Sequence, residues 1–154
     1  MEITIEIPIK SYLKKYIEVS FGENIKLSER TWIGIIIYNV IKRKTFKNNY
    51  DYKPVSEDIN AQMQFKISSD TSYRYGCILL PTQIYYINSA LDGLFKGEIV
   101  KQALINRSSY DIDFKTSILT ILDAYDITED ELNYESIRKY FNRNYQKYKN
   151  RLIF

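Results

Sequence analysis

The first ten residues restrict the fold most strongly, because their hydrophobicity alternates at every position. In the stretch EITIEIPIK, isoleucines at positions 3, 5, 7 and 9 alternate with polar residues and a proline. A period of two is typical of a β-strand with one buried face and one solvated face. Pro8 lies on the polar face and has no backbone N–H, which favours a strand at the edge of a sheet. The chain is therefore expected to build a sheet, with partner strands elsewhere in the sequence.

Two later segments are predicted as the partner strands. Residues 62–67 alternate in the same way, residues 73–80 are rich in apolar side chains, and a turn at 68–71 separates them. Helical periodicity covers much of the rest. The predicted helices are 12–19 after a Ser11 cap, 29–44 after a Ser28 cap, one that starts at Pro81, 98–105, one capped by Asp113, a short one with the capping-box pair Thr128 and Glu131, and 134 to about 149 after an Asn133 cap.

These elements predict an α+β fold, with a small antiparallel sheet, covering helices and a helical, basic C-terminal subdomain. The polar residues 45–60 are expected to form a loop, and 107–112 form a weak boundary. We expect an α+β core over residues 1–107 and the helical subdomain over 108–154, or one continuous domain. At 154 residues, the chain is long enough to bury a hydrophobic core.

Cysteine and hydropathy indicate a compartment. Cys77 is the only cysteine, which excludes an intramolecular disulfide and fits a reducing environment. Its apolar neighbours favour inert packing over catalysis. No N-terminal signal pattern is present, and the longest apolar run, 32–37, is far shorter than the roughly 20 residues of a membrane span. We expect a cytoplasmic protein without a membrane partner.

Histidine is absent, and this removes several kinds of chemistry. The commonest general base, the usual metal ligand and every nucleophile–histidine pair are lost. Only carboxylates remain as metal ligands, and the acidic stretch 123–135 does not match a calcium-binding loop. No glycine-rich phosphate loop occurs. We therefore expect no enzyme, no catalytic residue, no metal and no cofactor.

Positive charge is concentrated at the C-terminal end. Residues 134–151 hold six basic residues and one acidic residue, a net charge of +5 that exceeds the +3 of the whole chain. Aromatic residues recur there every three or four positions and are expected to pack inward. Localised positive charge suits phosphate binding, because each neutralised phosphate releases counterions. The candidate nucleic-acid-binding residues are Arg138, Lys139, Asn142, Arg143, Gln146, Lys147, Lys149 and Arg151. The alternatives are a solvated amphipathic helix and a surface for a protein partner.

The residues before this helix extend the pattern. The segment SILTILDAYDITEDELNYESIRKYFNRNY resembles the helix-turn-helix motif of DNA-binding proteins, although residues 130–133 resemble an insertion and the glycine of the tight turn is missing. The resemblance implies that Tyr134, Glu135, Ser136, Lys139 and Arg143 approach DNA.

The N-terminal strand and the two helices after it are similar in order to ribbon-helix-helix proteins, in which paired strands enter the major groove. Here that strand face would present Glu2, Thr4 and Glu6, and the two carboxylates would repel phosphates. We favour a strand that shares a sheet with residues 62–67 and 73–80.

Three segments, PIKSYLKKY, SERTWIGIIIYNVI and YESIRKYFNRNY, resemble small uncharacterised proteins of bacteriophages and integrated mobile elements. That resemblance implies an accessory role in replication, transcription control or packaging in a bacterial host cell. The leading hypothesis is a protein that binds DNA, with RNA as a further option. The alternative is a virion component or a host-factor inhibitor whose basic helix binds an acidic protein surface. Homo-oligomerisation stays open in both.

Overall fold

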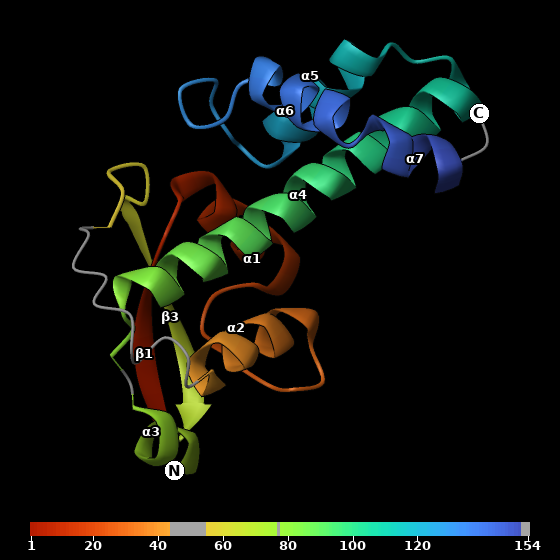
Figure 1. Ribbon diagram of the computed structural model, residues 1–154. Coiled ribbons are helices and arrows are strands. Elements are labelled where there is room, and N and C mark those ends of the chain that lie inside the picture. Colours follow the sequence, from red (N-terminus) through yellow and green to blue (C-terminus); the bar gives the residue numbers. More distant parts are fainter. Residues whose placement is uncertain (44–54, 77, 152–154) are drawn as a thin grey trace. The chain divides into compact units, whose positions relative to one another are not determined.

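The computed structural model of the chain describes residues 1–43, 55–76 and 78–151 (Figure 1). They pack as two units, 1–91 and 92–154, and the change from one unit to the other falls inside a long helix. The predicted α+β class is confirmed, because the described residues form three strands and seven helices. Where the sequence suggested a boundary, at 107–112, the long helix ends at Tyr110.

The first unit contains the sheet. Its strands are β1 (Glu2–Ile9), β2 (Ile25–Lys26) and β3 (Ala61–Ser68), in the order β1-β3-β2. β1 and β3 lie side by side and antiparallel, with Ile5 opposite Phe65 (Figure 1). β2 is parallel to β3, so the sheet is mixed rather than purely antiparallel. β1 is an edge strand as predicted, and its isoleucines face the core.

The third predicted strand, 73–80, is wrong. Residues Ser69–Tyr75 form a helix, α3, and no described residue of 76–80 belongs to a strand. Ser68 caps this helix, because its Oγ accepts a hydrogen bond from the backbone N–H of Thr71 at 3.3 Å. The predicted turn at 68–71 is therefore the start of a helix. Cys77 lies outside the described residues.

The predicted starts of the first two helices need correction. The helix α1 (Ser11–Phe21) includes Ser11, which therefore does not cap it. The helix α2 (Trp32–Lys42) begins three residues later than predicted, because Thr31 is its cap and accepts a hydrogen bond from the N–H of Gly34 at 3.2 Å. Of the predicted loop, residues 55–60 belong to no helix or strand, and 45–54 lie outside the described residues.

The helix α4 (Pro81–Tyr110) starts at the proline as predicted. Its Asn88 is only 1% exposed and meets the end of β1. The Asn88 Oδ1 accepts from the N–H of Lys10 at 2.9 Å, while Nδ2 donates to the carbonyls of Pro8 at 3.0 Å and Ile84 at 2.9 Å. The buried amide is therefore fully hydrogen-bonded.

Two glycines in α4 led to the prediction of a break and a second helix over 98–105. The structure contradicts this, because the helix runs without interruption to Tyr110. Its buried positions continue at intervals of four residues through and beyond the glycines, and this stripe holds the helix together. The stripe consists of Ile87, Leu91, Phe95, Ile99 and Ala103.

Three more helices complete the second unit: α5 (Phe114–Ala124), α6 (Tyr134–Arg143) and α7 (Tyr145–Arg151). The predicted caps Asp113 and Asn133 are confirmed, since their side chains accept from backbone N–H groups at 3.2 and 2.8 Å. Glu131 bonds the N–H of Thr128 as a capping box requires, but the segment forms a turn instead of the predicted short helix. Asn144 divides the predicted last helix into two. Among the described residues, no helix has both the length and the apolar character needed to cross a membrane.

Candidate nucleic-acid interface

The helices α6 and α7 carry most of their aromatic side chains on the side that packs into the second unit. Tyr140 donates a hydrogen bond from its hydroxyl to the carbonyl of Gly93 on α4, at 3.3 Å. The hydroxyl of Tyr148 donates to that of Tyr140, also at 3.3 Å. Ile137, on the same side, is fully buried. These contacts fix the rotation of both helices about their axes.

The ring of Phe141 packs against three other aromatic rings of the second unit. Its ring centroid lies 5.1 Å from that of Phe114 on α5, 5.5 Å from that of Tyr145 and 6.1 Å from that of Tyr148. Such spacings are those of favourable aromatic pairs. Burial raises the pKa of the Tyr148 hydroxyl well above its ordinary range, with a further contribution from its hydrogen bond to Tyr140. A tyrosine hydroxyl is protonated at neutral pH in any case, so it is able to donate this hydrogen bond.

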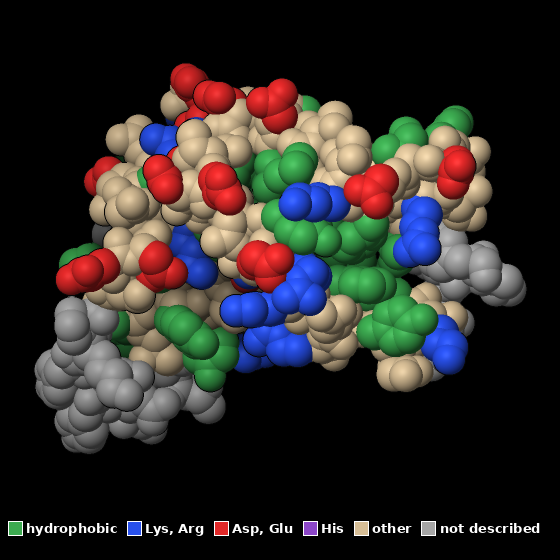
Figure 2. Space-filling view, turned by 90° about the horizontal axis from the view of Figure 1, so that it is seen from above, with side chains coloured by type: hydrophobic (Ala, Val, Ile, Leu, Met, Phe, Trp, Pro, Cys, Tyr) green, Lys and Arg blue, Asp and Glu red, His purple; other side chains and the backbone are tan. Residues whose placement is uncertain are grey.

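The opposite side of α6 and α7 is polar, and we call it the basic face. It consists of Arg138, Lys139, Asn142, Arg143, Gln146, Lys147 and Lys149, all of which are exposed. Arg151 ends α7, and its side chain lies outside the part that the structure describes. Figure 2 shows lysine and arginine side chains close together on the side that it displays, beside hydrophobic ones. The structure thus brings seven of the eight predicted residues onto one side of two helices.

One cation of the basic face is already paired. The Nη2 of Arg138 lies 2.8 Å from the Oε2 of Glu135, and its Nε donates to the same oxygen at 3.0 Å. This hydrogen-bonded pair lowers the pKa of Glu135 and raises that of Arg138. Among the described residues, Lys139, Arg143, Lys147 and Lys149 have no carboxylate within ion-pair distance. Arg143 donates from its Nε to the carbonyl of Lys139 at 3.3 Å, but in the described residues none of the four cations has its charge neutralised by a carboxylate.

Lys115, on α5, is a neighbour of this site that the sequence prediction missed. Its Nζ lies 5.4 Å from the ring centroid of Tyr134, the first residue of α6, and its positive charge contributes to lowering the pKa of Glu135. Lys115 therefore stands beside the start of the basic face. The sequence feature that could have indicated Lys115 is its position directly after Phe114. The ring of Phe114 packs against Phe141 of α6.

The helices α5 and α6 contact each other, with residues 125–133 between them. Of the five residues that the helix-turn-helix resemblance directs toward DNA, Lys139 and Arg143 are exposed and unpaired with carboxylates in the described residues. The other three have partners. Tyr134 lies under Lys115, Glu135 binds Arg138, and Ser136 bonds the side chain of Asn133. The geometry therefore favours the middle and the end of α6, rather than its first turn, as the contact region.

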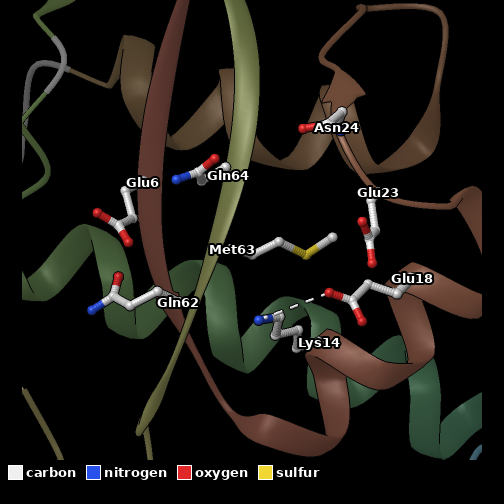
Figure 3. Close-up of a pocket in the computed structure, with 8 residues that line it drawn as sticks. All are labelled: Glu6, Lys14, Glu18, Glu23, Asn24, Gln62, Met63 and Gln64. Atoms are coloured by element: carbon white, nitrogen blue, oxygen red, sulfur yellow. Dashed lines mark ion pairs between the residues drawn. The ribbon is translucent and has the colours of Figure 1, made fainter.

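The first unit has a polar pocket of about 420 Å³ beside β3 (Figure 3). It is lined by Glu6, Lys14, Glu18, Glu23, Asn24, Gln62, Met63 and Gln64. Lys14 and Glu18, one turn apart on α1, form an ion pair at 3.8 Å (Figure 3), which leaves amides, two glutamates and a thioether. Within the described ranges, no three cysteine or carboxylate groups gather to hold a metal ion. The pocket shows no activated nucleophile, so the basic face is the stronger candidate site.

Comparison with known proteins gives no relative for either unit. No protein-family model, no curated protein and no solved structure matches the chain. Its function is therefore interpreted from the geometry of the basic face itself.

Proposed function

We propose that the protein is a non-enzymatic nucleic-acid-binding accessory protein that holds DNA on the basic face of α6 and α7. The observation that carries this proposal is the separation of the two sides of these helices. Aromatic side chains anchor one side to the second unit, while Lys139, Arg143, Lys147 and Lys149 remain exposed without carboxylate partners in the described residues. Phosphate oxygens supply the missing negative charge.

The basic side chains make mostly phosphate contacts in this proposal. Asn142 and Gln146 are exposed among these basic side chains. Their amide groups can add hydrogen bonds to the bases or to the DNA backbone. The resemblance to proteins of bacteriophages and mobile elements supports a role in replication, transcription control or packaging, in the cytoplasm of a bacterial host.

Binding should depend steeply on salt concentration. If the four unpaired cations and Lys115 each neutralise one phosphate, the logarithm of the association constant should fall against the logarithm of salt concentration with a slope of about −4 to −5. Fluorescence anisotropy with labelled random-sequence oligonucleotides, duplex and single-stranded, measures this slope. If no oligonucleotide binds even at low salt, the proposal is wrong, and binding to an acidic partner protein then becomes the better explanation of the basic face.

The ion pair between Arg138 and Glu135 allows a substitution that should raise the affinity for DNA instead of lowering it. Replacing Glu135 by glutamine removes a negative charge and frees the Arg138 guanidinium, so affinity for DNA should rise by roughly two- to five-fold, in the energy range of an exposed ion pair. The matched control is Glu29→Gln, which breaks the exposed ion pair between Glu29 and Lys42 in the first unit and changes net charge equally. Equal effects of both changes would show that total charge, and not the basic face, governs binding.

A further inference from the structure

The arrangement of rings and cations on α6 and α7 restricts which nucleic acid the basic face fits. Proteins that hold single strands place aromatic rings among their cations, so that bases stack while phosphates are neutralised. Here the two kinds of side chain are on opposite sides. The hydroxyls of Tyr140 and Tyr148 are tied to Gly93 and to each other, and the ring of Phe141 is packed among three other rings.

Two further rings, those of Tyr134 and Tyr145, lie near the border of the basic face, and each already makes a contact within the second unit. Tyr134 has the ammonium of Lys115 above it, 5.4 Å from the ring centroid. Tyr145 is 46% exposed, but it stands edge-on to Phe141, with an angle of 88° between the two rings. Along the described part of α6 and α7, the bases of a single strand would therefore find phosphate contacts but only one exposed ring, that of Tyr145.

The backbone positions from which the cations extend are also anchored, since the two helices are held by a side-chain cap at Asn133 and by the tyrosine hydroxyls. From Arg138 to Lys149 the helical rise is at most about 17 Å, because Asn144 separates α6 from α7. Duplex DNA carries roughly ten phosphates over that length, and their positions are already fixed by the double helix. A flexible single strand, by contrast, loses conformational entropy when its phosphates are held in place.

The exposed amides of Asn142 and Gln146 distinguish further between duplexes. The major groove of B-form DNA is about 12 Å wide and admits an α-helix, whereas the major groove of A-form RNA is too narrow for side chains to read. The helix α6 presents the amide of Asn142 between Lys139 and Arg143, and α7 adds Gln146 beside Lys147, so the two helices suit a DNA duplex.

We infer that the basic face is selective for double-stranded DNA, with α6 lying along the major groove and Lys139, Arg143, Lys147 and Lys149 on the phosphates beside it. This inference rests on the proposed function but goes beyond it, since nucleic-acid binding alone requires no preference for a duplex. It assigns the aromatic side chains to the support of the helices and none of them to base stacking.

The test compares three probes on the full chain at low salt: a DNA duplex of about two helical turns, each of its separate strands, and an RNA duplex of the same sequence. We expect the DNA duplex to bind at least about ten-fold more tightly than either strand or the RNA duplex. Single strands or RNA duplex bound as tightly as DNA duplex would overturn the inference and leave the proposed function standing. Binding of none of the probes would overturn both.

A substitution at the border ring separates stacking from support. Tyr145→Leu keeps an apolar contact with Phe141 but removes the ring. Affinity for the single strands should change less than about two-fold, whereas the loss of a stacked base would cost about 5- to 150-fold, the equivalent of 1–3 kcal/mol. Circular dichroism should confirm that the variant keeps its helices. A loss of more than five-fold in a folded variant would contradict the inference.

Discussion

A chain carrying Lys139→Glu, Arg143→Glu and Lys147→Glu is expected to lose at least about a hundred-fold in affinity for duplex DNA at low salt. The three side chains are exposed and lack carboxylate partners in the described residues, so they are the cations best able to meet phosphates. Each substitution removes one counterion-releasing contact and places a carboxylate against the phosphate row. The salt slope should flatten by about three units for the same reason.

The control for this reversal is Arg30→Glu, Arg43→Glu and Arg74→Glu. These three arginines are exposed in the first unit, and their reversal changes the net charge of the chain by the same amount. Duplex binding should weaken much less in the control, because its charges do not lie on α6 or α7. Affinities that fall equally in both triple variants would sink the assignment of the site, and thermal unfolding should show that both variants are folded.

Replacing Gly34 by alanine is expected to destabilise the protein severely. Gly34 is buried in the first turn of α2, and a Cβ at this position would lie 1.9 Å from the carbonyl oxygen and 2.7 Å from the carbonyl carbon of Ser28. Both are backbone atoms, so no rotation of a side chain can relieve the overlap. The segment must move, and this breaks the cap in which Thr31 accepts from Gly34 and donates to Ser28.

The expected cost is about 3 kcal/mol or more, from overpacking and a lost cap together. For a unit of this size it corresponds to a fall of roughly 12 °C or more in the midpoint of thermal unfolding. The matched control is Gly93→Ala in α4, where a Cβ meets nothing within 4 Å. There alanine should stabilise the helix by up to about 1 kcal/mol, because it is the better helix former. A Gly34→Ala protein as stable as the unchanged chain would refute the close packing described at this turn.

β1 and β3 were predicted from the sequence because alternation with a period of two can be seen within each segment alone. The structure pairs these two strands with each other. The sequence could not predict β2, since Ile25 and Lys26 form a strand only through their pairing with Phe65 and Lys66. Residues 73–80 were predicted as a strand from their apolar side chains, after a turn at 68–71. The local hydrogen bond of Ser68 outweighed that preference and started a helix.

For the candidate site, the division of α6 and α7 into a basic and an aromatic side was visible as a helical period. The cap at Asn133 was visible as well. What remained hidden depends on contacts between helices: the approach of Lys115 to Tyr134, and the tie between Tyr140 and Gly93. The ion pair of Arg138 with Glu135 has the ordinary spacing of three residues, but the sequence does not state which acid a cation selects.

The amide of Asn88 has a consequence for association between chains. In a parallel sheet, a residue donates to the carbonyl before its opposite residue and accepts from the N–H after it. Asn88 does the same around Ile9, through Pro8 and Lys10, and so imitates a single residue of a fourth strand along the outer side of β1. In ribbon-helix-helix dimers the β1 strands of two copies pair with each other. A second copy of this chain could pair with the edge of β1 in that way only after breaking the two hydrogen bonds from Asn88. A side chain from α4 thus occupies the backbone hydrogen-bonding groups at one end of the edge strand β1.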